Sequence, residues 1–171
     1  ISALTASKLT GALPAISGAS LTGLPAGGIT EADTWKMGTA FTPSSGQVYL
    51  TANWARDPTS GFGKLGTGMS QSSGVFTFPS TGVWEIYYCI AVYNSGVAAY
   101  MHSNIKTTID NGSNYVSAAS AFSNIAITGG LYTGMKNAAI FDVTNTTNCK
   151  VKFGVYTYND SNAQVNGNTY V

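Results

Sequence analysis

Apolar and polar residues alternate with a period of two along much of the chain after Glu31, which predicts β-strands rather than helices. The longest alternating run begins at Val83 and carries a single charge, Glu85. One face of this strand would present Trp84, Ile86, Tyr88, Ile90 and Val92, and the other Val83, Tyr87, Cys89, Ala91 and Tyr93. In a two-sheet sandwich the domain covers only the inner face of each sheet. We therefore expect a partner subunit to cover the second apolar face.

Further strand patterns follow, separated by turn residues. A short aromatic strand over residues 74–78 ends at Pro79, and residues 80–82 form a tight turn. Strands are also predicted at 105–109, after Tyr115 and at 138–143, and a hairpin-type turn at 110–112 separates the first two. A half-exposed strand follows Cys149, with Val151, Phe153 and Val155 on one face and Lys150 and Lys152 on the other. This number and spacing of strands predicts an antiparallel sandwich or jelly roll.

The first 30 residues have a different pattern, with small residues, Leu, Ile, Pro and Gly but no aromatic residue. Near-copies of one phrase stand at 9–15 and 21–26, and Pro14 and Pro25 exclude a long helix. Such a segment cannot bury its apolar residues alone, so we expect it to be an extended stalk intertwined with identical chains. A flexible linker is the alternative. The stalk residues expected at the subunit interface are Leu9, Leu13, Ile16, Leu21 and Leu24.

The composition argues against several functional classes. Charged residues make up 9% of the chain and the net charge is +1, which leaves no electrostatic footprint for nucleic acid or an anionic membrane. No apolar run approaches the roughly 18 residues of a membrane span. Because the chain begins at Ile1 rather than Met, we expect it to be a fragment or a processed product.

Residues for catalysis or metal binding are few and dispersed. The single histidine, His102, is more typical of a hydrogen-bonded surface residue than of a catalyst, and no Cys/His cluster has metal-ligand spacing. We expect neither an enzyme nor a metal or cofactor site, although the sequence leaves open a carboxylate pair assembled across subunits, as in glycosidases. For Cys89 and Cys149, two buried free thiols are favoured over one disulfide.

Several of these segments resemble known families. Residues 64–88, KLGTGMSQSSGVFTFPSTGVWEIYY, and residues 138–153, AAIFDVTNTTNCKVKF, resemble strands of the globular heads shared by complement C1q and tumour necrosis factor. The phrase LTGALPAISGASLTGLPAG resembles repeats that precede the C-terminal heads of phage tail fibres and virion spikes, and residues 29–35 resemble the joint between these parts. The resemblance implies a homotrimer, with a stalk over residues 1–30 and ten-stranded jelly-roll heads over 31–171. In these families the final strand usually continues past the position of Val171, so it is expected to be truncated here.

A trimeric fibre or spike head on the surface of a virion is expected to attach to a host glycan or protein, with avidity from three copies. Its stalk would join other virion proteins, and no nucleic acid or membrane insertion is expected. Tyr, Asn, Ser and Gly are the residues of adaptable recognition loops. The candidate receptor-binding residues are Tyr93, Asn94, Asn111, Asn114, Tyr115, Tyr132, Tyr158 and Asn159, while Tyr87 and Tyr93 are expected at the trimer interface. A structural role in capsid decoration or fibre capping, and a bacterial adhesin of the same fold, are the alternatives.

Overall fold

The computed structural model describes residues 28–56, 63–94, 98–125, 130–158 and 163–167. They form antiparallel β-sheets without a helix, as the alternation predicts. The largest sheet has six strands in the order β10-β9-β12-β7-β6, with β3 also paired to β12. Its strands are β3 (Gly46–Tyr49), β6 (Ser70–Ser72), β7 (Val75–Thr77), β9 (Ala98–Thr108), β10 (Val116–Ile125) and β12 (Lys150–Thr157).

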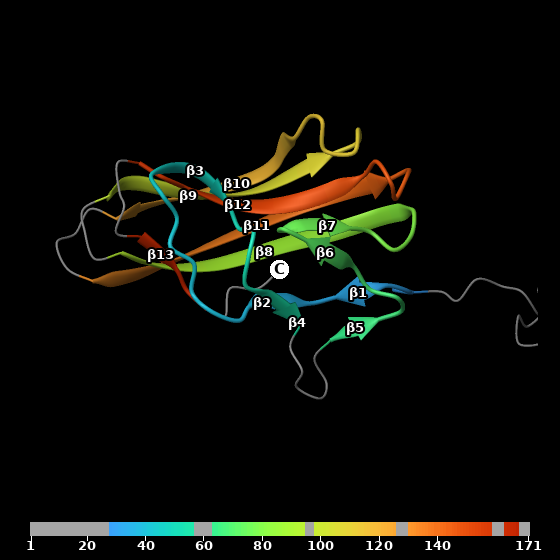
Figure 1. The fold of residues 1–171 in the computed structure, drawn as a ribbon, viewed down its shortest axis with the longest axis horizontal. Coiled ribbons are helices and arrows are strands. Elements are labelled where there is room, and N and C mark those ends of the chain that lie inside the picture. The colour runs from blue at the N-terminus through green and yellow to red at the C-terminus, as the bar shows by residue number, and fades with distance from the viewer. Residues whose placement is uncertain (1–27, 57–62, 95–97, 126–129, 159–162, 168–171) are drawn as a thin grey trace, which may run out of the picture.

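A three-stranded sheet, in the order β11-β8-β13, packs against the large sheet to make a sandwich (Figure 1). Its strands are β8 (Gly82–Asn94), β11 (Leu131–Val143) and β13 (Ala163–Val165). The 13 residues of β8 pair with the 13 of β11 along their whole length. On the other side of β13, Phe41 and Val165 exchange backbone hydrogen bonds of 2.9 and 2.8 Å, which extends this sheet.

Two short strand pairs lie near the beginning of the described chain. β2 (Trp35–Met37) pairs with β4 (Trp54–Arg56), and β1 (Ala32–Asp33) pairs with β5 (Lys64–Leu65). Figure 1 shows both pairs along the lower side of the molecule, next to β8. The chain therefore enters the sandwich beside the three-stranded sheet.

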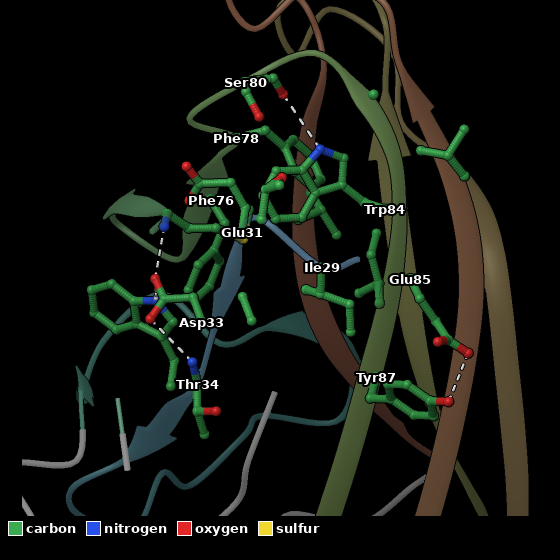
Figure 2. A pocket seen from close by; sticks show the side chains of 18 of the residues that line it. Ile29, Glu31, Asp33, Thr34, Phe76, Phe78, Ser80, Trp84, Glu85 and Tyr87 are labelled. Carbon is green, nitrogen blue, oxygen red and sulfur yellow. Dashed lines mark hydrogen bonds between the residues drawn. The ribbon is translucent and has the colours of Figure 1, made fainter. Parts of the chain in front are cut away.

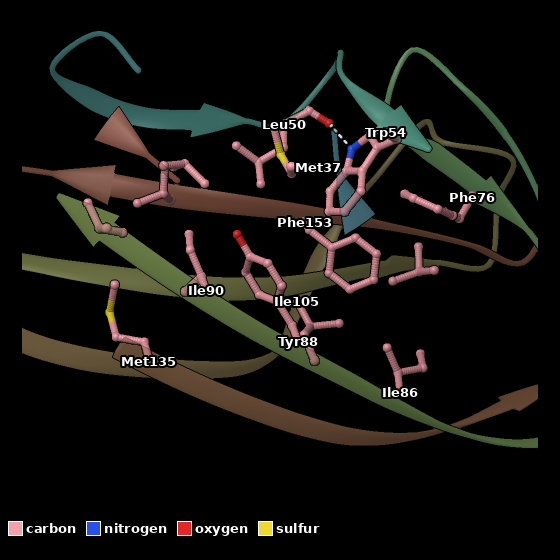
Figure 3. Close-up of a cluster of buried hydrophobic side chains, with 14 of the residues drawn as sticks. Met37, Leu50, Trp54, Phe76, Ile86, Tyr88, Ile90, Ile105, Met135 and Phe153 are labelled. Atoms are coloured by element: carbon pink, nitrogen blue, oxygen red, sulfur yellow. Dashed lines mark hydrogen bonds between the residues drawn. The ribbon is translucent and has the colours of Figure 1, made fainter. Parts of the chain in front are cut away.

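The core lies between the two sheets and is rich in aromatic rings (Figure 3). Phe76 packs edge to face against Trp54 and Phe153, with ring centroids 5.3 Å apart in both pairs, and Tyr88 lies 5.0 Å from Phe153. Trp54 donates its indole N–H to the carbonyl of Leu50 at 2.7 Å, so its polar atom is satisfied inside the core. Burial of each such side chain contributes about 1.5–3 kcal/mol.

The alternation predicted for β8 is confirmed on its inner face. Ile86, Tyr88, Ile90 and Val92 are all buried in the core. The turns predicted before β8 and at 110–112 are confirmed as well. The chain bends at residues 79–81, and Asn111 and Gly112 have φ of 58° and 91°. Both are left-handed conformations that Asn and Gly adopt most readily.

Several strand boundaries differ from the prediction. β9 begins at Ala98 rather than at residue 105. β9 ends at Thr108 rather than Ile109, because the turn begins at residue 109 and leaves that side chain exposed.

β11 begins at Leu131 rather than Ala138, so the candidate receptor residue Tyr132 lies in a strand rather than in a loop. Gly134, Lys136 and Asn137 in this stretch carry little strand propensity of their own. Pairing with the strongly strand-forming β8 imposes the strand on them.

Both cysteines are free thiols, as the sequence favours. Cys149 is buried in the core, whereas Cys89 is half-buried on the outer side of β8. The predicted stalk residues Leu9, Leu13, Ile16, Leu21 and Leu24 lie outside the described residues.

Candidate binding surfaces

The segment that leads into the sandwich is fixed by the buried carboxylate of Asp33. Its side chain is 2% exposed and forms an ion pair with Arg56, with Nη2 and Oδ2 2.8 Å apart. The indole N–H of Trp35 and the backbone N–H of Met69 also donate to Oδ2, at 2.9 and 2.7 Å. Burial raises the pKa of Asp33, but these hydrogen bonds and the Arg56 charge outweigh it and leave the pKa below its ordinary value. Asp33 is thus an ionised structural anchor.

Glu31 holds the same segment to the loop between β5 and β6. Its two carboxylate oxygens accept hydrogen bonds from the backbone N–H groups of Thr67 at 3.1 Å and Gly68 at 3.0 Å. The acidic residues at the predicted joint are therefore both used to position backbone. Neither is placed as a general acid or base.

A cleft of about 790 Å³ opens between residues 28–35 and the first half of β8. Figure 2 shows Ile29, Phe78 and Trp84 around it, with Asp33 on one side and Glu85 and Tyr87 on the other. The indole N–H of Trp84 bonds to the carbonyl of Ser80 at 3.3 Å, which leaves mainly carbon atoms facing the cleft. The cleft can accept apolar groups, and it continues onto the outer face of β8 through Val83 and Tyr87.

The outer side of β8 and β11 forms an exposed apolar face. Val83, Tyr87 and Ile140 are 73%, 54% and 77% exposed. Tyr132 of β11 is also exposed and packs against Tyr93 of β8, with ring centroids 5.1 Å apart. The side chains of this apolar face come from alternating positions of the two paired strands: Val83, Glu85, Tyr87, Cys89, Ala91, Tyr93, Tyr132, Lys136, Ala138, Ile140 and Asp142. The second apolar face predicted for β8 is thus present and uncovered in the single chain.

A row of aromatic rings, here called the aromatic ladder, crosses the outer side of the large sheet. It comprises, in contact order, Phe122, His102, Tyr156, Tyr100 and Tyr158. Each ring centroid lies 4.8–5.8 Å from the next, and three of the four contacts are nearly parallel stacks. The ladder forms because the register places residues from three strands side by side on one face.

The aromatic ladder also carries polar groups. A hydrogen bond between the side chains of Tyr100 and Tyr156 raises the pKa of Tyr100. Burial and the nearby Lys106 charge lower the pKa of His102, which keeps its imidazole neutral at pH 7. The ladder is therefore uncharged and carries hydroxyl groups.

A group of lysines stands at the other end of the same outer face. Lys106, Lys150 and Lys152 alternate with buried residues of β9 and β12, so they project away from the core. The Lys152 ammonium lies 3.7 Å from the ring centroids of both Tyr49 and Tyr115. Burial and the Lys106 charge lower the pKa of Lys152. We call Lys106, Lys150 and Lys152 the lysine group.

The loop between β9 and β10 is held by hydrogen bonds to Asp110. Asp110 accepts hydrogen bonds from the Thr108 hydroxyl at 2.5 Å and from the backbone and side-chain amides of Asn114 at 2.9 and 2.7 Å. These bonds lower the pKa of Asp110 to about 2. The predicted receptor residue Asn114 thus already uses its amide donor within the loop, while Asn111 stays exposed.

The predicted receptor residues do not gather in one place. Tyr93 and Tyr132 lie together on the apolar face, Tyr158 belongs to the aromatic ladder, and Tyr115 packs on Lys152. Asn94 is fully buried at the end of β8 between β11 and β13, so its selection as a surface contact is wrong. Asn159 lies outside the described residues.

Most residues of the aromatic ladder are not among the binding residues predicted from the sequence. Tyr100, His102 and Lys106 occupy alternating positions of one strand pattern, which was the available signal. Their partners Phe122 and Tyr156 could be added only with the register of three strands.

In the part of the chain that the structure describes, no group of three or more His, Cys, Asp or Glu side chains could hold a metal ion. The same residues include no helix suited to spanning a lipid bilayer. No protein-family model matches the chain, and no characterised protein compared with it is significantly similar in sequence.

Proposed function

We propose that this chain is the head of a trimeric phage fibre or spike, which attaches to the surface of a host cell by non-covalent, multivalent binding. The observation that carries the proposal is the apolar face on β8 and β11. A stable soluble monomer rarely leaves several large apolar side chains exposed together on one sheet face, and a second copy of the chain would cover them. The number of copies, three, comes from the resemblance to trimeric fibre heads.

The order of the strands supports a jelly roll of the C1q and tumour necrosis factor type. The chain passes from one sheet to the other at five connections. These are the connections before and after β8, between β10 and β11, and on either side of β12. After β8, the only two consecutive described strands that lie in the same sheet are β9 and β10. Repeated crossing between two antiparallel sheets is typical of jelly rolls.

Attachment, rather than catalysis, is supported by what the acidic groups do. The carboxylates at the cleft are engaged by protein donors: Asp33 by Arg56, and Glu85 by the Tyr87 hydroxyl at 2.6 Å. Broad outward surfaces, one apolar and one aromatic, are what remains available to partners. Three copies would present three such aromatic surfaces and gain avidity.

The proposal is tested by adding the fluorescently labelled chain to a panel of Gram-negative and Gram-positive bacterial strains. Saturable binding to particular strains is expected, and an assembly-deficient Ile140→Asp variant should bind at least about tenfold more weakly through loss of avidity. Assembly without binding to any strain would contradict the attachment function and favour the structural role of a fibre cap or capsid decoration.

A further inference from the structure

We propose that the outer face of the six-stranded sheet binds an acidic glycan. The aromatic ladder would pack against the sugar rings, and the lysine group would bind the carboxylate, sulfate or phosphate groups. This inference rests on the proposed function, because it specifies the chemical class of the host receptor and the surface that binds it.

The charge of this face favours an anion. The six strands of the sheet contain no Asp or Glu, whereas three lysines project from them. Lys106 and Lys152 stand directly opposite each other on neighbouring strands, and neither has an ion pair with any described residue. Like charges at opposed positions destabilise a sheet. A bound anion would offset this repulsion, and the opposite apolar face, which carries both signs of charge, has no such site.

The aromatic ladder favours a sugar at the other end of the face. Its end rings, Phe122 and Tyr158, are 70% and 41% exposed, while the rings between them are partly covered by one another. Exposed rings give apolar contact to the C–H faces of a pyranose, and tyrosine hydroxyls bond to its hydroxyl groups. The ladder has no aliphatic side chain among its members, which distinguishes it from the apolar face.

The distance between the two parts favours an extended ligand. Tyr156 and Lys152 are four residues apart on β12, and His102 and Lys106 are four apart on β9, so each pair spans about 13 Å. Gly154 lies between them, and a Cβ there would come within 2.8 Å of Asn104 Oδ1. The missing side chain leaves room for the amides of Asn104 and Gln47, which bond to each other at 2.8 Å. A single pyranose ring is shorter than this span, so an oligosaccharide fits the face better.

Single-stranded nucleic acid also combines rings with negative charge, but the ladder suits it less. Bases stack on free ring faces. In the ladder the faces of the three middle rings are stacked against neighbouring rings, so only the end rings offer a free face, to a base or to a sugar. A run of successive bases would need more free faces than these two rings provide. The net charge of the chain, +1, is also low for contacts to successive phosphates.

The test uses the assembled chain on an array of oligosaccharides that carry uronate, sialic acid, sulfate or phosphate, each beside its uncharged parent. Polyglutamate, single-stranded RNA and single-stranded DNA complete the array. We expect binding to at least one acidic glycan, at least about tenfold weaker binding to its uncharged parent, and weakening by salt. Polyglutamate should not bind, because it lacks the sugar rings.

Four variants locate the site with the glycan that binds most tightly. Phe122→Ala and Lys106→Gln should each weaken binding at least about tenfold. The matched controls Leu65→Ala and Lys64→Gln, both on exposed β5, should bind as the parent chain does. All four positions project from the surface, and circular dichroism checks that each variant is folded.

Three results would overturn the inference: no acidic glycan binds, nucleic acid or polyglutamate binds equally well, or binding survives Phe122→Ala and Lys106→Gln unchanged. The proposed attachment function would stand in each of these cases if the chain still binds bacterial cells. Conversely, ladder-dependent glycan binding without any cell binding would support this site and contradict host attachment.

Discussion

The outer faces of the two sheets contrast sharply, although the inner faces are alike. Both sheets direct alternating apolar residues into one shared core. Outside, β8 and β11 present Val83, Tyr87 and Ile140 to solvent, whereas β9 and β12 present tyrosines and lysines. The alternation of apolar and polar residues therefore identifies the side of each strand that faces the core. The residues on the outer side indicate which kind of partner that sheet can bind.

The contrast also separates two kinds of association. An apolar face loses water most favourably against an equally apolar surface, which a second copy provides. A face with three lysines, no carboxylate within its strands and a row of hydroxylated rings fits a hydrated, anionic partner instead. One molecule can thus assemble through one sheet and bind through the other.

The largest expected effect follows from placing a charge on the apolar face. Ile140→Asp should abolish assembly, because burying an unpaired carboxylate costs about 3 kcal/mol or more per site, or over 100-fold in association. Ser120→Asp, on the outer side of the large sheet, is the matched control and should leave the assembly unchanged. Sedimentation equilibrium measures the assembly of both variants. An Ile140→Asp variant that assembles like the parent would show that the apolar face is not the surface through which copies associate.

A smaller effect, on the free energy of unfolding, is expected at Asp33, in the segment that leads into the sandwich. Asp33→Ala should lower the free energy of unfolding by about 2–4 kcal/mol, because it leaves Arg56 without its partner and the Trp35 and Met69 N–H groups unsatisfied. Urea unfolding in the Ile140→Asp background measures this without assembly, with exposed Asp142→Ala as the control.

The pH dependence of the same pair has a defined sign. Because the pKa of Asp33 is lowered on folding, its stabilisation is present above the unfolded pKa of about 3.9 and is lost as pH falls through the folded value. The difference between the parent and Asp33→Ala should therefore shrink in acid. A difference that is equally large after full protonation would contradict the ionised anchor.

The aromatic ladder should be sensitive to a milder pH change. The pKa of His102 is lowered on folding by burial and by Lys106, the charged side chain facing it on this outer surface. Its contribution to stability is present above the unfolded pKa of about 6.5 and is lost as pH falls through the lower folded value. NMR titration should place its midpoint below 6.5, and His102→Gln should flatten the loss of stability between pH 7 and 5. A midpoint at or above 6.5 would contradict the burial of the ring in the ladder.

The smallest effect is the relief of repulsion within the lysine group. Lys106→Gln should raise the free energy of unfolding by about 0.2–0.5 kcal/mol, and the pKa values of Lys152 and His102 should rise as the neighbouring charge is removed. Lys136→Gln on the apolar face has no opposed lysine and is the control, since Lys136 lies across from Cys89. Equal stability changes in the two variants would show that the lysines of the large sheet do not repel each other.

The sequence was sufficient for features that depend on one strand or turn. The inner and outer sets of β8 and the left-handed turn at Asn111 and Gly112 all follow from local patterns, and the structure has them. A period of two in a strand and the tolerance of Asn and Gly for positive φ are properties of the local chain.

Features that depend on pairing could not be predicted in the same way. Asn is a residue type common in loops, but Asn94 is buried because it pairs with both Leu131 and Ala163. The aromatic ladder requires Phe122, His102 and Tyr156 to share a register across three strands, and no single segment carries that information. Contacts of this kind are set by the tertiary fold.

Native mass spectrometry of the unmodified chain tests self-association through the apolar face most directly. The main species should have three times the 17.7 kDa mass of one chain, and Ile140→Asp should reduce it to a single chain. A parent chain that stays at 17.7 kDa at micromolar concentration would show that the outer side of β8 and β11 is stable in water without a second copy.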